Sequence, residues 1–305
     1  MVCLLAMVCC ALWGSAFPCI KVGYRLFQID SADTATQILF AGCRFTIAGI
    51  MVILFGSILQ GRFLKPGKGD LPRIGKICLL QTVIQYFFFY VGLAHTTGVK
   101  GSIVEASNVF LAILVSSLIF HQEKLDQKKV LGCIVGFAGV VLINLSGSNV
   151  DMSFNLTGDG FIFISAIAYA LSSVLIKKYS AKSDPVMLSG YQFTAGGLVM
   201  ILIGFVMDGR IHTASMPAMI LLIYMALISA VAYTLWGILL KYNPVSKVSI
   251  FGFTNPVFGV LLSAIILREG NVFGMKDLIA LVLVSIGILI VNWAKPVGEK
   301  EKGMN

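Results

Sequence analysis

Charged side chains are scarce in this chain. Asp, Glu, Lys and Arg make up 12% of its 305 residues, whereas hydrophobic residues make up 58%, and the mean hydropathy is +0.92. Soluble globular chains are about one quarter charged. The longest polar stretches, around 61–76 and 146–160, have the length of loops, so the sequence leaves no room for a soluble domain. Function must therefore reside within a membrane.

The sequence also lacks the signatures of several kinds of chemistry. No Gly-x-x-x-x-Gly-Lys-Ser/Thr loop is present, so we do not expect ATP hydrolysis by this chain. The three histidines, His95, His121 and His212, lie far apart and without metal-ligand spacing. The seven cysteines lie in or beside apolar stretches, with no paired spacing in an external loop, which favours packing over disulfide or thiolate chemistry. We therefore predict that the protein is not an enzyme and uses no cofactor or metal.

What is present is a series of long apolar stretches. A helix of about 20 residues crosses the hydrocarbon core of a bilayer, and lipid permits only helices and closed barrels to span it. These stretches lack the two-residue alternation of barrel strands. The sequence therefore predicts an all-α membrane protein of about ten transmembrane helices, near 3–26, 34–59, 72–94, 98–120, 128–145, 157–178, 186–207, 217–240, 245–267 and 273–294.

The net charge of +9 is unevenly distributed between alternate loops. One set holds Arg62, Lys65, Lys68, Arg73, Lys76, Lys124, Lys128, Lys129, Lys177, Lys178, Lys182, Lys241, Lys247, Lys295, Lys300 and Lys302. The other set holds Arg25, Lys100, Arg210, Arg268 and Lys276. Lys and Arg in short loops mark the cytoplasmic side. The charge thus indicates orientation rather than nucleic-acid binding, and predicts a multi-pass protein of the cell inner (plasma) membrane with both termini cytoplasmic.

The chain also resembles itself at a shift of about 150 residues. The aligned segments are 41–49 with 189–197, and 139–144 with 287–292; Glu123 aligns with Glu269. Five spans per repeat is an odd number, so the second copy would enter the membrane from the opposite side. Inverted repeats in transporters enclose a central substrate site near the membrane midplane and permit alternating access.

The repeat defines the expected organisation of the chain. We predict a first five-helix repeat at 1–146, an external linker at 147–156, a second inverted repeat at 157–296 and a cytoplasmic tail at 297–305. The first span has neither a basic leading region nor a small-residue cleavage site, so we expect it to remain in the mature protein.

Several short motifs carry a family resemblance. They are Leu-Trp-Gly-Ser-Ala-Phe at 12–17, Arg-Phe at 44–45, Asn-Pro-Val-Phe-Gly at 255–259, and the acids at 123 and 269. With two five-span halves in register, the chain resembles bacterial EamA-type transporters of the drug/metabolite transporter superfamily. The resemblance implies a cavity lined mainly by spans one to four and six to nine, and export or exchange of small metabolites. The chain departs from the common pattern in having Glu105 in span four, and Phe110 where Pro256 stands in the second half.

Ionisable groups at membrane depth are costly and usually face a bundle interior or a water-filled path. The three that the sequence shows are Lys21, Arg44 and Glu105. Glu105 lies in a small, polar stripe with Ser102, Asn108, Ala112 and Ser116. Its carboxylate could bind a substrate amine or carry a coupling proton; the alternative is a buried ion pair with Arg44 or Lys21 that only fixes helix packing.

Arg44 could hold a substrate carboxylate with its planar fork, or it could bond backbone carbonyls at a helix break. Its counterpart in the second repeat is the neutral Gln192. For Lys21, snorkelling to the lipid headgroups is the favoured interpretation.

The remaining candidates for the cavity are neutral polar or aromatic side chains. A polar side chain in a span can equally be a hydrogen bond between helices, and a tryptophan can be core packing. A Gly132-x-x-x-Gly136-x-x-Gly139 pattern in span five predicts close helix packing within or between copies. The neutral candidates are Trp13, Gln81, Gln85, Tyr169, Gln192, Tyr233, Trp236 and Asn255.

These features together predict a secondary transporter that exports or exchanges a small organic metabolite, an amino acid or similar compound, by alternating access. Its partners would be the substrate, the lipid bilayer and, through Glu105, protons. The alternative is efflux of amphipathic cations or drugs with Glu105 as counter-ion or proton carrier. A membrane-embedded enzyme or a sensor would need a catalytic cluster or an output domain, and the sequence provides neither.

Overall fold

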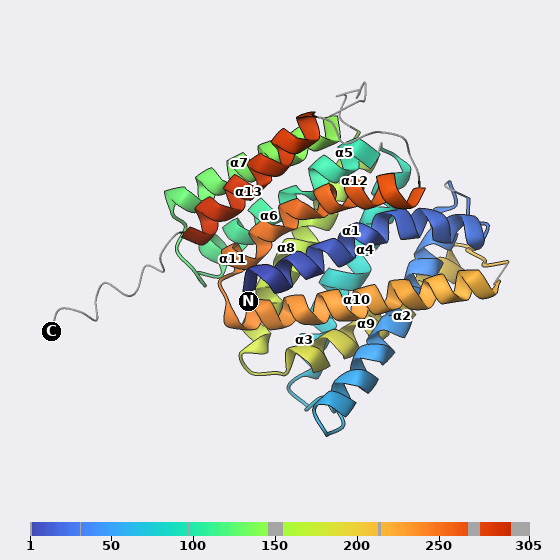
Figure 1. Cartoon of the computed structure of the whole chain (residues 1–305). Helices are drawn as coiled ribbons and strands as arrows, with labels where there is room; N and C mark the ends of the chain where they lie inside the picture. The colour runs from blue at the N-terminus through green and yellow to red at the C-terminus, as the bar shows by residue number, and fades with distance from the viewer. Residues whose placement is uncertain are drawn as a thin grey trace.

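The computed structural model describes residues 2–30, 32–96, 98–145, 155–212, 215–267 and 275–293, and this part of the chain is helical without strands (Figure 1). The helices are α1 Val2–Leu26, α2 Thr34–Leu59, α3 Leu71–Ile77, η1 Cys78–Ile84, α4 Gln85–Ala94, α5 Gly98–Glu105, α6 Ser107–Leu114, η2 Val115–Ile119, α7 Gln127–Leu145, η3 Leu156–Gly160, α8 Phe161–Ser180, α9 Pro185–Val206, α10 Met216–Tyr242, α11 Val245–Ser249, η4 Ile250–Phe253, α12 Thr254–Leu267 and α13 Met275–Trp293. Glu269, the predicted tail and most of the predicted linker lie outside the described residues.

Within the described residues, seven helical segments are long and apolar enough to cross a membrane: Val2–Leu26, Thr34–Leu59, Leu71–Ala94, Gly101–Ile119, Leu156–Ser180, Pro185–Val206 and Met216–Tyr242. The all-α membrane fold is thus confirmed. Three further helical segments, α7, α11 to α12, and α13, lie where the other spans are expected. The count of ten transmembrane helices stays a prediction.

Four of the predicted spans are not uniform α-helices, and the sixth begins with the π-helical segment η3. The third contains the π-helical segment η1, and the fourth is interrupted between α5 and α6 at Ala106 and ends in the π-helical η2. The ninth passes through the 3₁₀ segment η4. Hydropathy does not detect such interruptions, because the side chains remain apolar through them. Local departures from the α-helix within long helices are frequent at functional sites.

Helices α2 and α9 pack against each other over an extended contact, and glycines allow their backbones to approach closely. A Cβ atom at Gly49 would lie 2.3 Å from the backbone nitrogen of Thr194, and one at Gly197 would lie 2.4 Å from that of Thr46. The Thr46 hydroxyl donates to Gly42 O at 2.8 Å, and the Thr194 hydroxyl donates to Gly190 O at 2.9 Å. The contact is therefore reciprocal between the two segments that align in sequence.

Helices α7 and α13 pack side by side at the upper left of Figure 1. A Cβ atom at Gly132 would lie 2.8 Å from Gly287 O, and one at Gly287 would lie 2.6 Å from Gly132 O. The glycine pattern in span five thus serves packing within the chain. In the bundle centre α1 packs against α10 and α12, while α8 packs against α4 and α6.

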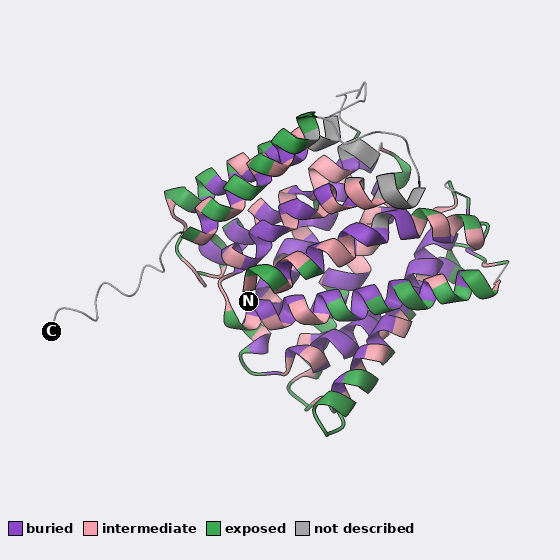
Figure 2. Ribbon diagram, in the orientation of Figure 1, coloured by how far each residue is buried: buried purple, intermediate pink, exposed green. Residues whose placement is uncertain are grey.

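The outer surface is apolar, as contact with lipid requires. Exposed residues lie on the outward sides of the helices and buried ones face the bundle centre (Figure 2). On α2, Phe55 is 54% exposed and Ile58 is 73% exposed. Exposed apolar surface of this extent is unfavourable in water and suited to acyl chains.

At one end of the bundle, the 120–126 loop is tied to α11 through Glu123. This carboxylate accepts hydrogen bonds from the backbone nitrogen of Ser246 at 2.9 Å and from the Ser246 hydroxyl. It also accepts from the Ser116 hydroxyl at 3.0 Å and forms an ion pair with Lys129 at 2.7 Å. Burial acts to raise the pKa of Glu123, but the hydrogen bonds from Lys129 and Ser246 outweigh it and hold the pKa below its usual value.

Candidate functional site

Arg44 is a cation that is buried in the bundle interior. It lies on α2 with 3% of its surface exposed, and its Nε donates to the Ser229 hydroxyl of α10 at 3.0 Å. The guanidinium carbon also lies 5.3 Å from the centre of the Phe45 ring. Within the described residues it makes no ion pair with a carboxylate. The structure thus gives Arg44 a hydroxyl and an aromatic ring as neighbours, and not the backbone carbonyls that one interpretation of the sequence expected.

Aromatic side chains form a wall beside Arg44. The ring of Trp13 on α1 meets Tyr233 and Trp236 of α10 edge to face, each with centroids 4.9 Å apart. The hydroxyls of Tyr233 and Tyr86, from α10 and α4, share a hydrogen bond. The indole nitrogens of Trp13 and Trp236 are buried without a hydrogen-bond partner in the described part of the chain. Both are donors that a bound polar group could use.

Phe45 and Phe193 close the same wall where α2 meets α9. Their rings stack with centroids 5.3 Å apart and an interplanar angle of 7°, and Phe193 also contacts Tyr233 at 4.9 Å. The two phenylalanines occupy aligned positions of the sequence repeat. The cation, the tyrosine pair and the two tryptophans therefore share one aromatic environment.

Glu105 is the last residue of α5, at the interruption before α6. Its Oε1 accepts a long hydrogen bond of 3.4 Å from Asn108. Its Oε2 is buried, and the nearby hydroxyl of Ser165 on α8 is the group placed to donate to this carboxyl. Ser102 lies half-buried one turn before it on α5. A carboxylate that lacks both a cation and a full set of donors is an unusual cost at membrane depth.

Arg44 and Glu105 do not form the ion pair that the packing interpretation of the sequence expected. No salt bridge joins them among the described residues, but Tyr233 lies close enough for both charges to act on its hydroxyl. Tyr169 of α8, which is 8% exposed, lies within the field of Glu105 and close to Tyr86. The cation and the acid thus lie near the same group of tyrosines.

The glutamine candidates behave differently from the charged ones. Gln192 of α9 donates to the side-chain oxygen of Gln81 at 3.0 Å and accepts from Thr82 at 2.7 Å. Gln192 is fully buried, so Gln81 and Gln192 lock η1 to α9 as a hydrogen bond between helices. Gln85 begins α4, and its buried side-chain oxygen has no partner in the described part of the chain. Gln85 therefore remains a candidate for a substrate contact.

Comparison with known proteins gives this arrangement a family. The sequence model of the EamA-like transporter family matches residues 1–145 and 156–293. The chain belongs to this family. An uncharacterized transporter of Archaeoglobus fulgidus is 26% identical over 286 residues, which cover 92% of this chain and 94% of that protein. The uncharacterized transporter YvbV of Bacillus subtilis is 25% identical over 92% of this chain and 88% of its own length.

Further relatives extend the EamA comparison to a plant and to a solved structure. A chloroplastic WAT1-related protein of Arabidopsis thaliana is 25% identical over 290 residues, which cover 92% of this chain and 67% of that protein. A crystal structure at 16% sequence identity superposes with a TM-score of 0.78 over 95% of this chain and 96% of that one. It shows the fold alone. The family match and the apolar helices together make this EamA protein a multi-pass membrane transporter.

Sequence reasoning missed several residues of the EamA site. Tyr86, one member of the tyrosine pair, and Tyr90 of α4 both lie near Arg44. Tyr24 of α1 lies close to Tyr90 and Arg44. Tyr86 and Tyr90 stand four residues apart in an aromatic run, one turn of a helix, and that spacing is the signal that could have found them. The predicted candidate Asn255 lies at the start of α12, and its buried Oδ1 has no partner within the described residues.

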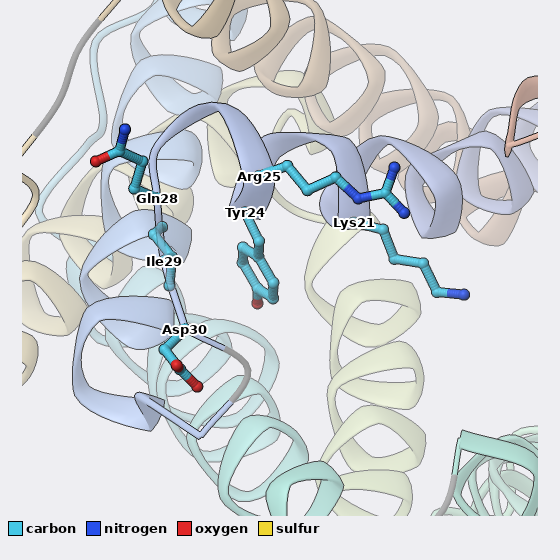
Figure 3. A pocket seen from close by; sticks show the side chains of 6 residues that line it. All are labelled: Lys21, Tyr24, Arg25, Gln28, Ile29 and Asp30. Atoms are coloured by element: carbon cyan, nitrogen blue, oxygen red, sulfur yellow. The ribbon is translucent and has the colours of Figure 1, made fainter.

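A pocket of about 400 Å³ lies at the C-terminal end of α1 in this EamA protein (Figure 3). It is lined by Lys21, Tyr24, Arg25, Gln28, Ile29 and Asp30. Lys21, Arg25 and Asp30 are exposed, whereas Ile29 is buried. Chemically, the molecule therefore offers a charged surface pocket at one end of α1 and, in its interior, Arg44 and Glu105 around a shared group of aromatic hydroxyls.

Proposed function

We propose that this protein is a secondary transporter that exports or exchanges a small zwitterionic metabolite, an amino acid or a similar compound, by alternating access. Arg44 binds the carboxylate of the substrate, and Glu105 binds its amine. The aromatic wall of Trp13, Tyr233 and Trp236 holds the apolar part of the substrate. The observation that carries the proposal is the burial of two opposite charges with neutral partners around the Tyr86–Tyr233 pair.

The energetic argument concerns charges without partners. A buried ion that is not paired with an opposite ion costs several kcal/mol in a medium of low polarity. A zwitterion supplies one group of each sign, so its binding compensates both residues at once. Arg presents two parallel donors that match a carboxylate, and a carboxylate accepts strong charge-assisted hydrogen bonds from an amine.

The inverted-repeat organisation supports alternating access. The reciprocal contacts between α2 and α9 and between α7 and α13 have the form of contacts across a two-fold axis. Repeats with five spans each would place that axis in the membrane plane, with the site between them. We further propose the inner (plasma) membrane as the location, with both termini in the cytoplasm, because the basic loops alternate as the positive-inside rule requires.

Counterflow in liposomes tests the proposal. The purified full-length protein is reconstituted with an unlabelled amino acid inside, and uptake of the same labelled amino acid is measured for a panel of amino acids at two pH values. We expect uptake of at least one amino acid above protein-free liposomes. Its methyl ester, which lacks the carboxylate, should not be taken up. Uptake of no amino acid in the panel would contradict the proposal.

A second candidate function is efflux of amphipathic cations or drugs. The aromatic wall beside the acid favours it, because aromatic faces and a carboxylate together bind organic cations. In this case Glu105 is the counter-ion or proton carrier. The same liposomes, loaded with a cationic dye, separate the two: loss of dye transport in Glu105→Gln with retained zwitterion transport would favour cation efflux.

A further inference from the structure

Ser229 of α10 holds the side chain of Arg44 by one nitrogen of its guanidinium. The Arg44 Nε donates to the Ser229 hydroxyl at 3.0 Å, and that hydroxyl donates to Met225 O, one turn earlier on α10, at 3.2 Å. A serine hydroxyl has one proton and two lone pairs. Because the proton of Ser229 is used on its own helix, its oxygen is oriented to accept from Arg44. Ser229 is fully buried.

The terminal nitrogens of Arg44 are left for another partner. A guanidinium carries five N–H donors in one plane, and the contact with Ser229 uses the one on Nε. Within the part of the chain that the structure describes, neither Nη1 nor Nη2 makes a hydrogen bond or an ion pair. The guanidinium carbon lies over the Phe45 ring, 5.3 Å from its centre. The edge between Nη1 and Nη2 offers two parallel donors, the arrangement that binds both oxygens of a carboxylate.

The second repeat contains the equivalent contact. At the shift that aligns the two repeats, Gln192 stands at the position of Arg44. By the same shift, Gln81 stands at the position of Ser229. Gln192 donates to Gln81 at 3.0 Å, just as Arg44 donates to Ser229. Both pairs therefore join one repeat to the other through equivalent positions.

The two equivalent pairs differ in the donors that they leave over. The side-chain oxygen of Gln192 also accepts from the Thr82 hydroxyl at 2.7 Å, so its amide is bonded through both nitrogen and oxygen. Ala230, which has no hydroxyl, stands at the position of Thr82 in the other pair. The glutamine pair is thus satisfied by its own repeat contacts, whereas the Arg44 pair keeps terminal donors for a ligand.

We propose that Ser229 is a positioning residue: it occupies Nε of Arg44 and so presents Nη1 and Nη2 to the carboxylate of the transported amino acid. This inference rests on the proposed function, which assigns carboxylate binding to Arg44. Ser229 itself does not touch the substrate. Without its hydroxyl, Arg44 keeps its charge but loses its fixed orientation, so the carboxylate contact weakens while the amine contact at Glu105 is unaffected.

Equilibrium binding to the purified full-length protein tests this role. Ser229→Ala removes the hydroxyl. Ser172→Ala in α8 is the matched control, because Ser172 is also fully buried and donates to Tyr169 O of its own helix at 2.7 Å. Among the hydrogen bonds of the described residues, none joins Ser172 to Arg44. The two ligands are the amino acid that the wild-type protein exchanges fastest in the counterflow panel and the amine formed by its decarboxylation.

We expect Ser229→Ala to raise the dissociation constant of the amino acid about three- to tenfold, the size of effect that one neutral hydrogen bond produces. The dissociation constant of the amine should stay at the wild-type value. Ser172→Ala should bind both ligands as the wild-type protein does. In an Arg44→Gln background, Ser229→Ala should cause no further loss for the amino acid, because no guanidinium is left to position.

Two results would overturn the role of Ser229. One is an unchanged or lower dissociation constant of Ser229→Ala for the amino acid, since the serine would then not orient Arg44 or would compete with the carboxylate for it. The other is an equal loss for the amino acid and the amine, which would make Ser229 a packing residue. Failure of the proposed function is distinguishable, because then the wild-type protein would bind no amino acid of the panel, or Arg44→Gln alone would bind as wild type does.

Discussion

At the scale of single residues, Arg44 and Glu105 each place an ionisable group inside the bundle among neutral neighbours. Arg44 contacts a hydroxyl and an aromatic ring, and Glu105 has one long hydrogen bond from Asn108. We propose that each has a separate role toward a substrate. Each role can be measured by deleting one substrate group and one side chain in turn.

Glu105→Gln should weaken binding of the transported amino acid. A hydrogen bond to a charged group contributes about 1.5–3 kcal/mol, so the dissociation constant should rise roughly tenfold to hundredfold. The deaminated acid with the same side chain lacks the amine, so its affinity should be equal in variant and wild type. Equilibrium binding of both compounds checks this, and an equal loss for both would contradict the role of Glu105.

Arg44→Gln should show the opposite pattern. Binding of the amino acid should again fall roughly tenfold to hundredfold, because the charged carboxylate contact is lost. The decarboxylated amine should bind variant and wild type alike. Arg44→Lys serves as a control, since it keeps the charge without the planar fork and should retain part of the affinity. An unchanged affinity of Arg44→Gln for the amino acid would contradict this assignment.

The charged residues of the site could be identified from the sequence, because ionisable groups within apolar spans are rare. The same argument could not tell which glutamines bond to one another between helices and which leave a polar atom without a partner. Gln81 and Gln192 bond each other between helices, whereas Gln85 leaves an oxygen without a partner among the described residues. That difference depends on which helices become neighbours, and hydropathy carries no information on it.

At the scale of helices, the α2–α9 contact depends on the absence of side chains at its glycines. The backbones approach so closely that a Cβ atom at Gly49 would lie 2.3 Å from Thr194 N and 2.4 Å from its Oγ1. Neither neighbour is the free end of a flexible side chain. Any substitution at Gly49 must therefore move the two helices apart.

Gly49→Ala should lower the thermal stability of the protein in detergent. Overpacking of this kind costs typically about 1–3 kcal/mol. The matched control is Gly75→Ala in α3, where an added Cβ meets nothing within 4 Å; this change should leave the melting temperature unchanged or raise it, because alanine favours helix. Equal melting temperatures of the two variants would contradict the close packing of α2 and α9.

The Glu123 connection between the 120–126 loop and α11 should depend on pH. Its pKa lies below the ordinary value of 4.5, so its stabilising effect is complete at pH 7 and is lost as the pH falls below about 4.5. Glu123→Gln should melt at a lower temperature than wild type at pH 7, and the difference should shrink toward pH 4.

The control for Glu123 is Asp208→Asn. Asp208 is 81% exposed and pairs with Arg210 at 2.9 Å, and an exposed ion pair contributes little. Its melting temperature should therefore follow that of wild type at every pH. A difference between Glu123→Gln and wild type that stays constant from pH 7 to pH 4 would contradict the ionised role of Glu123.

The helical segments themselves were predictable from apolar runs, and their interruptions were not. The break after Glu105 and the π-helical η1 leave the hydropathy of their spans unchanged. Both nevertheless lie at candidate site residues, Glu105 at the end of α5 and Gln81 within η1. We infer that such irregularities depend on tertiary contacts, which a single sequence does not display; in η1, the Thr82 hydroxyl donates to the Gln192 side chain of α9.

At the scale of the whole molecule, we propose that the chain consists of two halves around one site. The membrane fold and the family follow from composition, repeat and motifs together. The reciprocal packing of aligned segments, with Phe45 on Phe193 and Gly49 against Thr194, is the structural counterpart of the repeat seen in the sequence. Inverted halves would let the surroundings of Glu105 open to either side of the membrane in turn.

The accessibility of position 108 to a thiol reagent tests alternating access most directly. Asn108→Cys, one turn from Glu105, is made in a background without the seven native cysteines. A membrane-impermeant thiol reagent is then applied to sealed vesicles of each orientation. We predict labelling from both faces, with saturating substrate slowing it from both. Labelling from neither face, or from one face only, would contradict a central site reached by alternating access.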